Sequence, residues 1–122
     1  MTTRYEIPLD LWAPVRDEIL QLLRDVARRQ STTTYSGLAV KVTRFPLAPE
    51  SYALHELLGE IARSEDAAGR GMLSVVVVHK RDGMPGPGFF KLAAELGREA
   101  TDPMMLWSEE LKLVYRANAR PR

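Results

Sequence analysis

The chain has 122 residues, 45% of them apolar, which is enough for one hydrophobic core and too short for two. It contains no cysteine, so disulfides, thiolate nucleophiles and cysteine-based metal sites are excluded, and nothing argues for an oxidising compartment. No apolar stretch approaches the roughly 18 residues that a membrane helix needs, and the N-terminus lacks the apolar core of a signal peptide. We therefore expect one cytoplasmic domain over residues 1–122, without a membrane role.

The net charge of +1 conceals an alternation of sign along the chain. Residues 24–48 and 70–91 are rich in arginine and lysine, whereas residues 49–69 are acidic. Charged residues on a small domain often only solvate its outer faces. If one of these segments binds a partner, the basic ones suit an anion and the acidic one suits a basic surface.

The first and strongest helical pattern follows Trp12, since apolar residues recur from there to Val26 at the spacing of one helix face. Asp10 is the expected N-cap, and Pro14 is expected in the first turn, where its missing N–H costs least. This pattern predicts a long amphipathic helix.

Two further helices are predicted before the middle of the chain. The polar, β-branched segment 31–35 suits a helix interior poorly, and Ser36 can cap a short second helix, which gives a helix-turn-helix-like step. Apolar residues from Leu54 to Ile61 mark a third helix, which we expect to end near Gly69 or Gly71.

An apolar run from Met72 to His79, with four consecutive valines, is the clearest buried element. Because it has no polar alternation it cannot present a wet face, so it predicts an interior β-strand surrounded by helices. A fourth helix is expected from Phe89, and a fifth after Asp102 as N-cap. The fold class is therefore α+β, a small winged-helix-like domain with about five helices around a short buried sheet.

Two details complete the predicted architecture. Residues 117–122 are expected to form a flexible basic tail. The residues expected in the core are Trp12, Val15, Ile19, Leu57, Leu58, Ile61, Val75, Val77, Phe89, Leu92, Trp107 and Leu111.

The residue types that usually carry catalysis are sparse. The only histidines are His55 and His79, and neither has the sequence neighbours of a catalytic dyad or of a His-Glu-x-x-His metal motif. Ser36 has only half of a nucleophile elbow around it, and Val78 stands where a nuclease strand would carry an acidic residue. We expect no catalytic residue, no metal and no cofactor.

The loop that follows the predicted strand has the layout of a phosphate cradle, with glycines between a strand and a helix. Pro85 and Pro87 remove two backbone donors, however, and the spacing matches no established phosphate motif. The alternative is a purely structural role, in which the glycines supply positive φ while the prolines stiffen an irregular connection. The possible anion-binding residues are Gly83, Gly86 and Gly88.

The order of elements across residues 15–96 resembles the winged-helix DNA-binding domain of alkylguanine-DNA alkyltransferases and alkyltransferase-like proteins. Thr34, Tyr35, Leu38 and Ala39 are similar to the Thr-Tyr-Gly-x-Ile-Ala motif that opens the helix-turn-helix of that family. The pair His79-Lys80 is similar to the histidine and arginine of its Pro-Cys-His-Arg-Val strand end. The resemblance implies a DNA-binding domain.

Two departures from the family pattern limit what the resemblance implies. Val78 occupies the place of the alkyl-accepting cysteine, which excludes transferase chemistry. The third helix carries Glu56 and Glu60 in place of the arginine finger, and an acidic helix suits a phosphate backbone poorly. Residues 73–90 also resemble a run in small uncharacterised bacterial proteins, which implies no activity.

Two hypotheses of function follow. In the first, a non-catalytic module binds duplex DNA, and its salt-sensitive contacts come from Arg28, Arg29, Tyr35, Lys41, Arg44, His79, Lys80 and Arg81. In the second, the domain is a protein-interaction accessory whose acidic third helix docks a basic partner. The sequence sets no oligomeric state.

Overall fold

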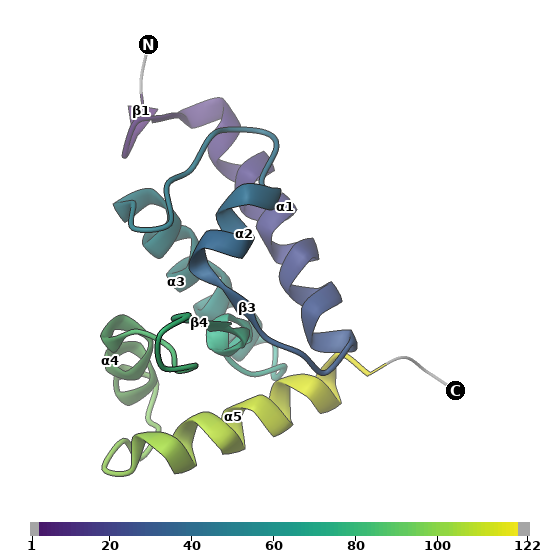
Figure 1. The fold of residues 1–122 in the computed structure, drawn as a ribbon, viewed down its shortest axis with the longest axis vertical. Helices are drawn as coiled ribbons and strands as arrows, with labels where there is room; N and C mark the ends of the chain where they lie inside the picture. Colours follow the sequence, from purple (N-terminus) through teal and green to yellow (C-terminus); the bar gives the residue numbers. More distant parts are fainter. Residues whose placement is uncertain (1–2, 120–122) are drawn as a thin grey trace.

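The computed structural model describes residues 3–119, which form five α-helices, one 3₁₀ helix and two small two-stranded sheets (Figure 1). This composition confirms the predicted α+β class. In the described residues, no helix combines the length and the apolar character that crossing a membrane requires.

The chain opens with a β-hairpin that the sequence pattern did not predict. Strands β1 (Thr3–Arg4) and β2 (Ile7–Pro8) pair antiparallel, and the two residues between them, Tyr5 and Glu6, both have positive φ. A two-residue turn of this kind matches the twist of the strands it joins. Ile7 is fully buried, so the hairpin attaches the N-terminus to the core.

Helix α1 (Leu9–Arg28) begins directly after the hairpin, so the prediction that Asp10 is its N-cap is wrong. Pro8 is the N-cap. Asp10 lies in the first turn, where its negative charge interacts favourably with the helix dipole. Pro14 consequently lies within the helix, one turn later than predicted.

The second helix, α2 (Tyr35–Lys41), is capped by Thr34 and not by Ser36. The Thr34 hydroxyl accepts a hydrogen bond from the Gly37 amide at 3.0 Å, which is the usual N-cap geometry. Immediately before the helix, strand β3 (Thr33–Thr34) uses the β-branched residues that made this segment a poor helix interior.

The valine run is buried as predicted, but the prediction that it is all strand is wrong. Residues Leu73–Val76 form the 3₁₀ helix η1, and only Val77–Val78 form a strand, β4, which pairs parallel with β3. Strand β3 has two residues, so it satisfies only a short length of partner backbone. The backbone groups of the preceding residues form local hydrogen bonds with one another instead, for example from the Val75 amide to the Met72 carbonyl.

The remaining helices surround this buried segment (Figure 1). Helix α3 (Tyr52–Ala67) ends before Gly69 and Gly71, both of which have positive φ, as the sequence predicts. Helix α4 (Pro87–Glu95) follows the glycine loop. Helices α1, α3 and α5 all contact η1, which places the valines at the centre of the described structure.

Helix α5 (Pro103–Ala117) confirms the predicted cap, since the Asp102 carboxylate accepts from the Met105 amide at 3.1 Å. The helix includes Ala117, so the predicted tail is wrong at its first residue, and residues 120–122 of that tail lie outside the described part of the chain. Of the predicted core, the residues that are only partly buried are Leu92, Trp107 and Leu111, which lie on the partly covered helices α4 and α5.

Candidate functional site

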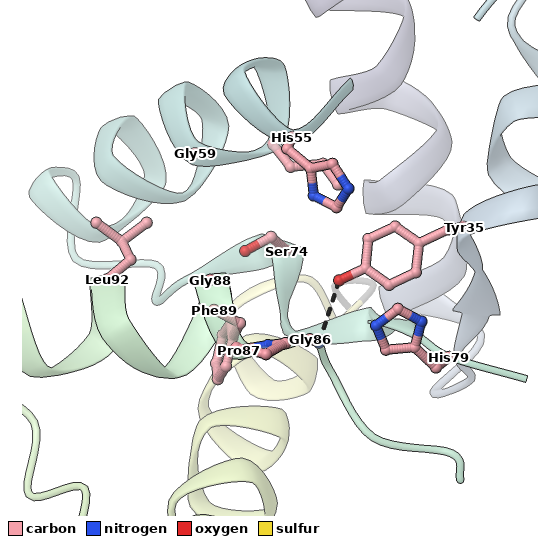
Figure 2. Close-up of a pocket in the computed structure, with 11 residues that line it drawn as sticks. Tyr35, His55, Gly59, Ser74, His79, Gly86, Pro87, Gly88, Phe89 and Leu92 are labelled. Atoms are coloured by element: carbon pink, nitrogen blue, oxygen red, sulfur yellow. Dashed lines mark hydrogen bonds between the residues drawn. The ribbon is translucent and has the colours of Figure 1, made fainter. Parts of the chain in front are cut away.

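Both histidines of the chain lie against one tyrosine (Figure 2). The Tyr35 ring, at the start of α2, has its centroid 5.4 Å from that of His55 on α3 and 4.7 Å from that of His79 after β4. The rings are tilted by 38° and 35° from the tyrosine plane. Three titratable rings from three elements therefore form one cluster, which we call the ring cluster.

Strand register explains why residues 44 positions apart meet. Thr34 pairs with Val78, so the residues that follow each of them, Tyr35 and His79, leave the sheet at the same edge. Parallel strands bring their carboxyl ends together, and side chains there commonly line ligand sites. The contact between the Thr-Tyr motif and the strand end is therefore a consequence of one two-residue ladder.

The glycine loop closes back on the ring cluster. The His79 amide donates to the Met84 carbonyl at 2.9 Å, and the Gly83 amide donates to the His79 carbonyl at 2.8 Å. Gly83 has φ +69°, which suits glycine, so its role is in the turn. Gly86 is buried, and its amide donates to the Tyr35 hydroxyl at 3.3 Å (Figure 2).

A cavity of about 300 Å³ lies beside the ring cluster, between α3, η1 and the N-terminus of α4. One end is polar, with Ser74 joining the three rings, and the other is apolar. The lining residues used below are Tyr35, His55, Ser74, His79, Gly86, Pro87, Gly88, Phe89 and Leu92, all labelled in Figure 2, together with Leu58. Of the three loop glycines, Gly86 and Gly88 line this cavity and Gly83 does not.

Ser74 and His55 are the polar lining residues that the sequence did not assign to a site. The signal for Ser74 was present, because it is the only polar residue between Met72 and Val78. No comparable signal marks His55, since a histidine within an amphipathic helix commonly faces solvent. Its position became informative only when α3 was placed next to α2.

The environment sets the protonation of two members of the ring cluster. Burial raises the pKa of the Tyr35 phenol, and the hydrogen bond from the Gly86 amide opposes this only in part. Burial, followed by the charge of His79, lowers the pKa of His55. At neutral pH the site therefore offers a protonated phenol and an uncharged His55 imidazole, which are hydrogen-bond donors and acceptors without a fixed charge.

The basic residues of the DNA-binding hypothesis fall into separate groups. Lys80 and Arg81 follow the ring cluster directly and are exposed, and Lys41 is exposed at the other end of α2. Seven helical residues span about 10 Å, which is the length of α2 from Tyr35, next to His79, to Lys41.

The other predicted cations lie along α1. The amides of Thr43 and Arg44 both donate to the Glu18 carboxylate at 3.0–3.1 Å, ten residues before Arg28 and hence about 15 Å from it along the helix. Arg29 is already bound to Asp25 at 3.1 Å.

The acidic character of α3 is largely neutralised. Each of its four carboxylates contacts an arginine, within the described residues: Glu56 with Arg4; Glu60 with Arg4 and Arg16; Glu65 with Arg24 and Arg70; Asp66 with Arg98. Glu60 also accepts from the Trp12 indole at 3.1 Å. These carboxylates hold α3 to the rest of the fold, so they are not a free acidic surface.

Comparisons with known proteins found no match among protein-family models, curated proteins or solved structures. Within residues 3–119, no group of three histidine, aspartate or glutamate side chains is arranged to hold a metal ion.

Proposed function

We propose that the protein binds duplex nucleic acid through a strand-end surface made of Tyr35, Lys41, His79, Lys80 and Arg81. The observation that carries the proposal is the pairing of β3 with β4, which joins the two motif halves that resemble a DNA-binding domain. Lys80 and Arg81 extend from that junction into solvent. Phosphate oxygens favour such cations, and a tyrosine or histidine can add a hydrogen bond to the same backbone.

The neutralised helix α3 also supports this proposal over the alternative of a basic protein partner. The alternative depended on free carboxylates, and those of α3 already contact arginines. For the same reason, α3 repels a phosphate backbone less than its sequence suggests.

Fluorescence anisotropy with a labelled 20-base-pair duplex tests this function. If three or four phosphates are neutralised, raising the salt from 50 to 200 mM should weaken binding by about 40- to 150-fold. The double variant Lys80→Ala/Arg81→Ala should weaken binding at low salt and reduce the logarithmic salt slope by about two.

Lys112→Ala is the matched control, since it removes an exposed lysine from α5, away from the strand-end surface. It should leave the slope within a few tenths of the wild-type value. Absence of binding at 50 mM salt, or an equal loss in the control, contradicts the proposal. The triple variant Arg28→Ala/Arg29→Ala/Arg44→Ala then asks whether the end of α1 belongs to the same surface.

A further inference from the structure

We propose that the cavity beside the ring cluster is a binding site for a small carboxylic acid with a compact apolar body. Its walls combine a polar end with an apolar end, as small-molecule sites generally do. The cavity shares Tyr35 and His79 with the proposed nucleic-acid surface, but the exposed cations of that surface, Lys41, Lys80 and Arg81, do not line it.

The polar end holds hydrogen-bonding groups that the protein leaves unused. Ser74 is 9% exposed and its side chain extends into the cavity (Figure 2), but no hydrogen bond to its hydroxyl exists among residues 3–119. The Tyr35 hydroxyl accepts from Gly86 and keeps its own proton to donate. No buried side-chain oxygen or nitrogen among the described residues lacks a hydrogen-bond partner, so solvent reaches the Ser74 hydroxyl, and a ligand oxygen can replace water as its partner.

Backbone at the start of α4 adds to these donors. Gly88 lines the cavity in the first turn of the nine-residue helix, where amides lack partners within the helix and the dipole favours negative charge. A Cβ built at Gly88 would meet no atom within 4 Å, so space is open there. Ser74, Tyr35 and Gly88 line the same cavity, and their donors suit an oxyanion.

The charge of the lining decides which oxyanion fits. Among the described residues no arginine or lysine lines the cavity, and at neutral pH His55 is uncharged because of its lowered pKa. The one other lining side chain that can be cationic is His79, a single charge. A phosphate ester carries up to two charges and generally requires cationic partners, whereas a carboxylate carries one and is satisfied by hydroxyl and amide donors. The cavity accordingly favours a carboxylate.

The apolar end decides what the ligand carries. Leu58, Phe89 and Leu92 form that wall with Pro87, and a volume of about 300 Å³ admits a ring or a short branched chain. Benzoate has this shape, and it can be compared with phenyl phosphate, which changes the anion, and with benzamide, which removes the charge.

Titration of the ¹⁵N-labelled protein with the three compounds tests the site. We expect benzoate to bind with a Kd on the order of 0.1–1 mM, as suits a ligand of this size, and to shift the amides around Tyr35, Ser74 and Gly88. Phenyl phosphate should bind at least about fivefold more weakly, and benzamide should give no saturable shift. Equal or tighter binding of phenyl phosphate, or no binding of benzoate, overturns the proposal.

Substitutions locate the binding and separate it from the proposed function. Ser74→Ala keeps the side-chain volume nearly unchanged and should raise the Kd for benzoate about tenfold. Ser108→Ala on α5 should leave this Kd unchanged. Lys80→Ala/Arg81→Ala should weaken binding of the duplex but leave binding of benzoate unchanged, since neither residue lines the cavity. Unchanged benzoate binding in Ser74→Ala places the compound elsewhere and overturns the proposal.

Discussion

Gly86 is the residue at which the ring cluster admits least extra volume. A Cβ built there would lie 2.9 Å from Nε2 of His79 and 3.4 Å from the Tyr35 hydroxyl oxygen. Its φ is −73°, so the requirement for glycine comes from close approach and not from backbone conformation. The residue lets the loop pass next to two side chains of the site.

Gly86→Ala should therefore displace the His79 ring and destabilise the protein by about 1–2 kcal/mol. The expected signs are a lower urea midpoint and a changed chemical shift of the His79 ring protons. Gly88→Ala is the matched control two residues later, where space is open, and it should be neutral or stabilising by up to about 1 kcal/mol because alanine favours a helix. Equal stability of the two variants would refute this account of Gly86.

At the scale of elements, periodicity predicted the five helices because it is a local signal, whereas of the three predicted N-caps only Asp102 is correct. Asp102 followed by Pro103 identified the start of α5, and glycines identified the end of α3. The hairpin before α1 was missed because its two strands have only two residues each. The 3₁₀ helix in the valine run was missed because it depends on the length of the pairing strand β3. That strand has only two residues, and the pattern within the valine run does not reveal this.

The site shows the same division. The Thr-Tyr motif, the strand-end histidine and the glycine loop were recognisable, because each has a local signature. Their convergence depends on the β3–β4 pairing, and the contribution of His55 depends on the packing of α3 against it. The neutralisation of the acidic helix could not be predicted, because the arginines that contact its carboxylates come from residues 4–24 and 70–98.

The Glu110 carboxylate connects α5 to the residue that precedes η1 and to the loop that follows α4. Glu110 is 4% exposed, and its carboxylate accepts from the Met72 amide at 2.8 Å and from Arg98 at 3.0 Å. Removing it leaves a buried amide and a partly buried guanidinium without this partner, so Glu110→Ala should cost about 3–5 kcal/mol. Chemical denaturation measures the loss.

Glu109→Ala provides the comparison, since Glu109 is exposed on the same helix. It should change stability by less than about 0.5 kcal/mol. A loss of similar size in both variants would mean that helix propensity, and not the buried contact, explains the effect of Glu110→Ala.

For the molecule as a whole, three groups make stability depend on pH in the same direction. Burial alone would raise the pKa of Glu65, but hydrogen bonds from Arg70 and Arg24 and their charges lower it below its ordinary value. Burial alone would also raise the pKa of Glu18. The hydrogen bonds from Thr43 and the Arg44 amide outweigh this effect of burial, so the pKa of Glu18 is lowered as well. Burial and the charge of His79 lower the pKa of His55.

A group whose pKa is lower in the folded state binds more protons when unfolded, so acid favours unfolding. The His55 contribution is complete above about pH 6.5, its unfolded pKa, and is lost as the pH falls through the folded pKa. The glutamate contributions are complete above about pH 4.3 and are lost below it. Urea midpoints should therefore fall modestly from pH 7.5 to 5.5 and steeply from pH 5 to 3.

His55→Gln separates the two steps, because glutamine does not titrate while Glu65 and Glu18 remain. The variant should show little change in its urea midpoint between pH 7.5 and 5.5, yet lose stability below pH 4.3 as the wild-type protein does. The first step is small because solvent reaches His55 on one side, so paired measurements on both proteins are needed. An identical fall between pH 7.5 and 5.5 in the two proteins would assign that step to a group outside the ring cluster.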